Sequence, residues 1–385
     1  MRKSFSAIIV LGLLLALQIS GLAATRDEGR LFPVKSGNLV GFIDVNGMVI
    51  IPLQFGEVGE FEEGLAPAQE ADSGKWGYID RTGNFVIQPQ YKFAFSFSEG
   101  LAGVWFEPTG GGYIDHSGRL VIQGFGGGAV HDGLVPIRTK EKKIFADKTG
   151  VELFDAPGDA WPVGGGLIAF MRNGRMGFMD RQGVVIIQPI YHCDVNWREQ
   201  QFEERITPVS AVTSDGKEKF GFIDINGKTV VDFQFDWAEQ FFDGLAMVSK
   251  DGKHGYVNTA GEVGIPLQFD GADHFSEGLA AVEVDGRWGF IDTQGRMVIA
   301  PQYLSRMWGS PMVFSEGLAA VRTETGTGFI NRAGEMVVPA VYRSVDDFSG
   351  GLALIGSPSN PSYVNKWGKV VWPRDELRDP ASIKW

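Results

Sequence analysis

The sequence lacks most of the features by which enzymes and metal proteins are recognised. Cys193 is the single cysteine, so this chain forms no internal disulfide and must be stabilised by packing. The five histidines are scattered without the HExxH spacing of a zinc site, and no G-x-S-x-G nucleophile motif occurs. The glycine runs at 109–113 and 124–129 do not open a helix, which argues against a phosphate site. We therefore expect a protein without enzymatic activity, catalytic residues, cofactor or metal ion.

Long apolar runs are confined to the N-terminus. Arg2 and Lys3 precede the apolar segment 7–17, and small residues follow up to Ala24. This order predicts a secretory signal peptide over residues 1–24, because the apolar segment is too short to span a bilayer comfortably. An uncleaved membrane anchor is the alternative. We expect the mature chain to be exported, to the periplasm or the cell exterior, and not to span a membrane.

Basic residues are also in short supply. The sequence has 35 of them against 47 acidic residues, and removal of residues 1–24 changes the net charge from −12 to −14. An acidic protein of this size repels phosphate backbones, so we expect no nucleic-acid partner. Glycine, with 53 residues, and phenylalanine, with 28, are abundant. Many turns and many aromatic core positions predict an all-β protein.

One sequence pattern recurs about every 34 residues. Each copy contains G-[FY]-[IV]-[DN], a turn glycine, an apolar pair, a proline and an aromatic residue, and the segment F-x-[ED]-G-L-A comes shortly afterwards. About ten copies fill an array over residues 25–373, and 374–385 reads as a polar tail. Eight copies are clear, a degenerate copy covers 143–154, and the final copy covers 362–373. The clear copies have their Gly-aromatic step at Gly41, Gly77, Gly112, Gly177, Gly221, Gly255, Gly289 and Gly328.

The strings KWGYID at 75–80, RWGFID at 287–292, FSEGLA and VIQPQY closely resemble the WG repeat family of bacterial proteins. The resemblance covers nearly the whole chain after residue 24 and concerns the fold. It implies no catalytic residue and no ligand. Two copies depart from the pattern, since 121–128 lacks the proline-aromatic element and 143–154 lacks the Gly-aromatic step.

The residues of one copy predict a three-stranded antiparallel meander. In 279–301, LAAVEV is β-rich, Asp285-Gly286 is a two-residue hairpin turn, and RWGFID and RMVIAP form the second and third strands. We expect Pro301 to end the third strand, because proline donates no hydrogen bond to a ladder. In the link F-x-[ED]-G-L-A, the Phe and the Leu are expected to be core anchors worth about 2 kcal/mol each. The acidic-Gly pair forms the bend between them.

The recurring Asp has a structural explanation. An Asp or Asn that opens a turn accepts a hydrogen bond from a backbone N–H two residues further on, and the glycine that follows supplies the left-handed conformation. A catalytic acid would not tolerate an amide in its place, whereas a turn residue would. Both types occupy this slot, namely Asp44, Asp80, Asp115, Asp180, Asp224 and Asp292, and Asn258, Asn331 and Asn365. A hydrolase with dispersed carboxylates is therefore the least favoured function.

The tryptophan slot has a similar explanation. Trp76 and Trp288 share it with Met176, Phe220 and His254 of other copies. Exchange among bulky residues indicates a space to be filled rather than a ligand to be bound. Sugar stacking on exposed tryptophans is the alternative.

About thirty strands are too many for one open sheet. We expect the tandem array of about ten three-stranded β-meander repeats to stack as an open superhelix or solenoid. The alternative is one or two propeller-like closed rings.

Recognition is expected where the repeat is interrupted, because insertions map to loops. The insertions at 193–208 and 304–312 carry Trp197 and Arg198, and Arg306 and Trp308. Aromatic and Arg residues on loops are typical interface anchors, although the two tryptophans could instead plug local cores. We predict an exported, non-enzymatic binding or scaffolding repeat protein whose partner is a protein or a cell-envelope component. A carbohydrate-binding protein that uses exposed tryptophans is the alternative.

Overall fold

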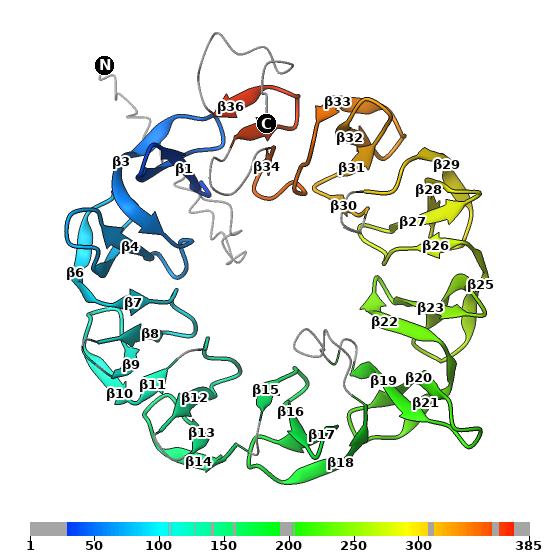
Figure 1. Cartoon of the computed structure of the whole chain (residues 1–385), viewed down its shortest axis with the longest axis horizontal. Coiled ribbons are helices and arrows are strands. Elements are labelled where there is room, and N and C mark those ends of the chain that lie inside the picture. Colours follow the sequence, from blue (N-terminus) through cyan, green and yellow to red (C-terminus); the bar gives the residue numbers. More distant parts are fainter. Residues whose placement is uncertain are drawn as a thin grey trace, which may run out of the picture.

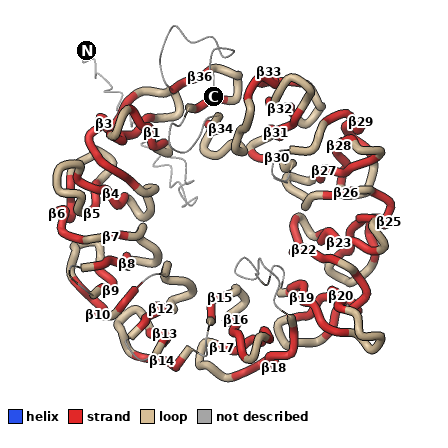
Figure 2. Tube along the Cα trace, viewed as in Figure 1, coloured by secondary structure: helices blue, strands red, loops and turns tan. Residues whose placement is uncertain are grey.

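The computed structural model describes residues 29–106, 108, 110–126, 128–139, 142–156, 159–192, 202, 205–306, 312–355 and 362–372. These residues form thirty-six β strands, and the strands make nine antiparallel sheets that follow one another around a ring (Figure 1). The described part contains strands and loops but no helix (Figure 2), and therefore no helix able to cross a membrane. The fold is a nine-bladed β-propeller. The predicted signal peptide at 1–24 and the tail at 374–385 lie outside the described residues.

The first half of the ring contains four sheets and begins with the widest. The first sheet has six strands, β1 (Phe32–Ser36), β2 (Leu39–Ile43), β3 (Val49–Val58), β4 (Ala66–Glu70), β5 (Trp76–Ile79) and β6 (Phe85–Tyr91). The second has β7 (Phe93–Ala94), β8 (Ala102–Trp105), β9 (Gly111–Ile114) and β10 (Leu120–Gln123). The third has β11 (Phe125–Gly126), β12 (Val135–Arg138), β13 (Lys143–Ala146) and β14 (Glu152–Asp155). The fourth has β15 (Ala160–Pro162), β16 (Leu167–Arg172), β17 (Arg175–Asp180) and β18 (Val185–Tyr191).

The second half contains five sheets of three or four strands. The fifth has β19 (Ile206–Val212), β20 (Glu218–Asp224) and β21 (Thr229–Phe235). The sixth has β22 (Trp237–Phe242), β23 (Leu245–Lys250), β24 (Lys253–Asn258) and β25 (Val263–Phe269), and the seventh has β26 (Gly271–Ala272), β27 (Leu279–Val284), β28 (Arg287–Asp292) and β29 (Met297–Tyr303). The eighth has β30 (Phe314–Ser315), β31 (Leu318–Arg322), β32 (Thr327–Asn331) and β33 (Met336–Tyr342), and the ninth has β34 (Leu352–Leu354), β35 (Tyr363–Asn365) and β36 (Val370–Trp372).

The predicted open superhelix is wrong, and the alternative of a closed ring is closer. The first and last sheets meet: the Tyr363 hydroxyl donates to the Pro33 carbonyl at 3.0 Å, and the Phe32 and Tyr363 rings lie 5.6 Å apart. Phe32 and Tyr363 share a core cluster with Val34 and Val371. An open array leaves an apolar face exposed at each end, whereas closure buries the two faces against each other. One ring contains all the sheets, rather than two.

The prediction of three-stranded units is also wrong for most of the ring. The link between units adds a short strand to the sheet that follows it, for example β7 beside β8 and β26 beside β27. This strand gives hydrogen-bond partners to backbone groups that an irregular link would leave unpaired. The first sheet is wider because β3 pairs with both β2 and β4, so that two sequence units share one sheet. In the eighth sheet, β30 lies on the inner side of the ring and β33 on the outer side (Figure 1).

In the described units that contain it, the proline does not end its strand, contrary to the prediction for Pro301. β29 continues to Tyr303, which pairs with Trp288, while Phe290 pairs with Ile299. Between these two pairs, Gly289 alone opposes three residues of β29, and Pro301 is the middle one of the three, in a bulge where no ladder hydrogen bond is needed. The bulge brings β29 against Gly289, where a Cβ atom would lie 2.4 Å from the Ile299 carbonyl oxygen. The glycine of the Trp-Gly block is thus required by a close backbone approach.

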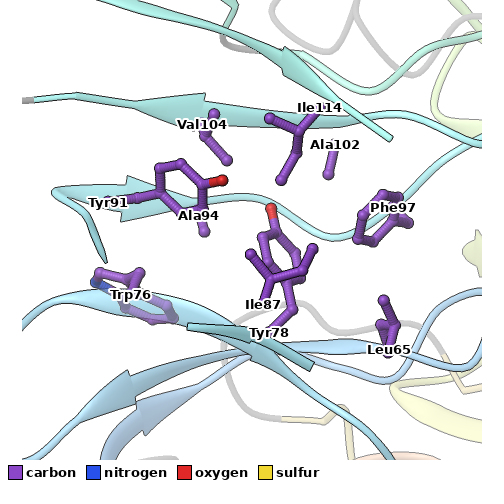
Figure 3. Packing of buried hydrophobic residues seen from close by; sticks show 10 residues of the cluster. All are labelled: Leu65, Trp76, Tyr78, Ile87, Tyr91, Ala94, Phe97, Ala102, Val104 and Ile114. Atoms are coloured by element: carbon purple, nitrogen blue, oxygen red, sulfur yellow. The ribbon is translucent and has the colours of Figure 1, made fainter. Parts of the chain in front are cut away.

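The core consists of clusters between neighbouring sheets. Figure 3 shows one of them, in which Tyr78 and Ile87 of the first sheet pack against Ala102 and Val104 of the second. Phe97 of the link is 2% exposed and anchors this cluster. The predicted role of the link Phe and Leu as core anchors is confirmed by Phe97, Phe275, Phe314 and Phe348, and by Leu65, Leu101, Leu245, Leu279, Leu318 and Leu352.

Candidate functional site

The recurring Asp and Asn residues open turns, as predicted. The Asp224 Oδ1 accepts the N–H groups of Asn226 and Lys228, both at 2.9 Å. The Asn331 Oδ1 accepts two N–H groups in the same way, both at 3.0 Å. A carboxylate and an amide thus perform the same task. The same pair of bonds is made by Asp44, Asp80, Asp115, Asp147, Asp180, Asn258, Asp292 and Asn365.

The acidic residues of the links join one sheet to the next, a role that the sequence did not reveal. Glu277 has a positive φ of 53°, and its carboxylate accepts the backbone N–H of Gly317 in the following sheet at 3.0 Å. We call the residues that do this the link carboxylates. Each link carboxylate accepts the backbone N–H of a glycine in the next sheet. Glu63 accepts from Gly100, Glu99 from Gly133, Asp243 from Gly278, Glu277 from Gly317, and Glu316 from Gly350 and Gly351.

Basic residues of the following sheet reinforce several link carboxylates. The Lys366 Nζ lies 3.0 Å from Glu316, and Arg332 lies 3.7 Å from Glu277. Partial burial disfavours the ionised form of Glu316, but Lys366 and the backbone N–H groups outweigh it and lower the pKa of this carboxyl. Each of these basic residues directly follows a turn Asp or Asn. His116, which follows Asp115, likewise lies 3.1 Å from Glu63 of the preceding sheet.

The tryptophan slot is part of the core, as its mixed occupancy predicted. Trp76 is 6% exposed and Met176 is 1% exposed, while Trp288 is half-buried. The tryptophans that do reach the surface lie in other positions. Trp105 at the end of β8 is 40% exposed, and Trp367 in a turn of the last sheet is 83% exposed.

Of the predicted anchor residues, Arg306 alone is described. Its guanidinium lies 3.1 Å from the Asp347 carboxylate and donates to the Val345 carbonyl at 3.0 Å, and its side chain is 8% exposed. Arg306 therefore joins the segment after β29 to the link before β34. Trp197, Arg198 and Trp308 lie outside the described residues, so their role stays a prediction.

Two carboxyl groups that sequence reasoning missed lie close together, and one of them, Asp273, also lies near Arg306. Burial raises the pKa of Glu239, on β22, to about 7, and the nearby Asp273 charge acts in the same direction. Burial also raises the pKa of Asp273 to about 6, against the Met312 N–H and the Arg306 charge, which lower it. Such groups can hold a proton near neutral pH. No group of three or more potential metal ligands occurs within the described ranges.

A cluster of aromatic side chains, also missed, lies at the junction of the first two sheets. The Phe93 ring is 5.3 Å from Trp76, 4.9 Å from Phe95 and 6.0 Å from Trp105. A signal was present in the sequence: the slot two residues before the link Phe holds Phe95 here, but Glu239 and Asp273 in two other units. The repeat therefore does not fix the residue type in this slot.

The solved structures that match this chain share little sequence with it. BamB from Moraxella catarrhalis is 12% identical over 79% of this chain and 98% of its own, with a TM-score of 0.33. Apo AztD from Citrobacter koseri is 11% identical over 80% and 93%, with a TM-score of 0.31. The C-terminal WD40 domain of Sif2 is 12% identical over 70% and 90%, with a TM-score of 0.34. Scores this low carry no conclusion about function.

Sequence comparison identifies the family. No curated protein matches this chain. The model of the WG containing repeat matches seven stretches, at residues 41–72, 76–104, 176–192, 220–253, 255–288, 288–303 and 328–355. These stretches contain both copies of the Trp-Gly block, at Trp76 and Trp288, most of the turn Asp and Asn residues, and the link carboxylates Glu63, Glu99, Asp243 and Glu277. The chain therefore belongs to the family of proteins built from WG-containing repeats.

Proposed function

We propose that this chain is an exported, non-enzymatic scaffold that binds a protein or another component of the cell envelope. One observation supports the proposal most strongly. The carboxylates that recur with the repeat are hydrogen-bonded to backbone N–H groups, either within their own turn or in the next sheet. The repeated residues thus build and join the blades, and recognition falls to residues that do not recur.

The two insertions are the first places to seek the partner. The segment that begins at Arg306 is fixed to the ring at its start by the bonds to Asp347 and Val345. We retain Trp197, Arg198 and Trp308, which lie outside the described residues, as proposed partner anchors.

A capture experiment tests the proposal. The mature chain, immobilised, is incubated with envelope extract, and the retained proteins are identified. We expect one reproducible partner, reduced by Trp197→Ala or Trp308→Ala and unchanged by Trp367→Ala, which removes an exposed tryptophan elsewhere. Equal capture by all variants would remove the two loops from the proposal.

Enzymatic activity is tested in the same preparation. Asp224→Asn keeps the turn acceptor but removes a carboxyl group, so a binding scaffold should be unaffected. A hydrolytic activity of the mature chain that this substitution abolishes would overturn the proposal.

A further inference from the structure

The surface aromatic residues of the second sheet form a platform, which we define as Phe93, Phe95 and Trp105. Phe93 and Trp105 pair across β7 and β8, and their rings are tilted by 51°. Phe95 completes the group, at 6.3 Å from Trp105. Phe93 and Trp105 are 37% and 40% exposed, and both are large apolar side chains.

The fold does not require an aromatic pair here. The corresponding cross-strand pair is Gly271 with Glu283 in the seventh sheet and Trp237 with Ser249 in the sixth, so the sixth sheet has an aromatic residue in the place of Phe93 but not in the place of Trp105. The two inner strand pairs of those sheets, β23 with β24 and β27 with β28, nevertheless place the same repeat positions opposite each other as β8 and β9 do. The platform is therefore a local departure from the repeat, which is where a binding function is expected.

The platform is held rigidly from below. Ala94 and Val104, the strand neighbours of Phe93 and Trp105, are 3% and 0% exposed and lie in the core cluster that Figure 3 shows. Because side chains alternate along a strand, Phe93 and Trp105 lie on the opposite face of their strands from Ala94 and Val104. Trp76, at 6% exposure, packs against Phe93 with the two rings tilted by 51°. The exposed rings are thus fixed in place before any ligand arrives, which lowers the entropic cost of binding.

The exposed area favours a small ligand over a protein. A buried aromatic side chain covers about 150–250 Å², so at their exposures Phe93 and Trp105 each offer about 60–100 Å² to a ligand. A standard protein interface takes about 800 Å² from each partner, far more than the platform provides. A lipid or a flat aromatic compound needs an enclosing pocket, whereas these rings stand partly in water at the surface.

We propose that Phe93, Phe95 and Trp105 bind a neutral carbohydrate. The C–H face of a pyranose ring stacks on an aromatic ring while the sugar hydroxyls remain in water, which suits half-exposed rings. Two tilted rings 6.0 Å apart can each receive one of two successive sugar units. The acidic net charge, −12 for the whole chain, disfavours polyanionic glycans. The inference rests on the proposed function, namely that the chain binds rather than reacts.

The test uses the mature chain and three neutral hexasaccharides, cellohexaose, chitohexaose and maltohexaose, with calorimetry and tryptophan fluorescence as readouts. We expect at least one of them to bind. Trp105→Ala should weaken that binding by about tenfold or more, as for other aromatic anchors. Trp105→Phe and Trp367→Ala should retain it. Phe93→Leu, which keeps the apolar volume, should weaken binding without lowering the unfolding temperature.

Two results would overturn the inference. One is that no neutral hexasaccharide binds, including the case in which a polyanion such as alginate binds instead. The other is that Trp105→Ala binds as tightly as the parent. The envelope capture experiment is repeated with Trp105→Ala, so that the two proposals can fail separately. Retained partner capture without glycan binding would remove the carbohydrate site and leave the scaffold proposal standing.

Discussion

Replacing Glu239 by glutamine is expected to stabilise the protein above neutral pH. Burial raises the pKa of Glu239 from 4.5 to about 7, the charge of Asp273 adds to this rise, and a hydrogen bond from Trp237 opposes it. The ionised form is therefore less stable in the folded chain than in water.

The sign and size follow from linkage. Between pH 4.5 and about 7, the folded state keeps the Glu239 proton that the unfolded state releases, so stability falls as pH rises through this window. A pKa change from 4.5 to about 7 corresponds to about 3 kcal/mol, lost in full above pH 7. Glutamine has no proton to release. The variant should therefore gain up to about 3 kcal/mol at pH 8 and differ little from the parent at pH 4.

Urea denaturation at both pH values measures the effect, with the slope against urea compared to confirm that the same surface unfolds. Glu262→Gln is the matched control, because Glu262 is an exposed glutamate in the turn between β24 and β25 of the same sheet. The reasoning is refuted if Glu239→Gln is less stable than the parent at pH 8, or if its gain is the same at pH 4 and pH 8.

Three further substitutions test the architecture by urea denaturation. Asp224→Asn should leave stability unchanged, whereas Asp224→Ala should cost about 1 kcal/mol by removing the acceptor of two N–H groups; equal losses would contradict the turn role. Gly289→Ala should lower the free energy of unfolding by about 1–3 kcal/mol, because its Cβ would lie 2.4 Å from the Ile299 oxygen. The control Gly264→Ala should lower it little, because the atom nearest to its Cβ would lie at 3.4 Å. The pKa of Glu316 is lowered, so its contribution to stability is complete above the ordinary value of 4.5 and is lost as pH falls through the lower folded value. Glu316→Gln should therefore flatten the acid limb of the stability profile, and an unchanged acid limb would refute the role of this carboxylate.

The local structure of each unit was predictable from the residues. An Asp or Asn followed three residues later by Gly defines a turn through its own hydrogen bonds, so the exchange of Asp224 for Asn331 between units revealed its role. The link Phe and Leu were recognised as core residues for the same reason, since their burial follows from their apolar character. In these cases the residues that determine a local structure lie within a few positions of it in the sequence.

The closure of the ring was not predictable in the same way. It depends on the angle between neighbouring sheets, summed over the array, and no single residue encodes that angle. The contacts that close it, such as Tyr363 to Pro33, join residues 330 positions apart. The link carboxylates were missed because their acceptor role appears only when the next sheet is in place, although the acidic-Gly pair itself was noticed. Glu239 and Asp273 were missed because a carboxyl in a link is usually exposed.

The central claim is that the units form one closed ring in which the first sheet packs on the last. The most direct test is a distance measurement by pulsed electron paramagnetic resonance between spin labels at Asn46→Cys and Lys369→Cys, with Cys193→Ser. Both labelled residues are exposed, and they flank the contact between Gly47 and Val371. The closed ring predicts a single short distance between the two labels. A long or broad distribution, as the two ends of an open superhelix would give, would contradict it.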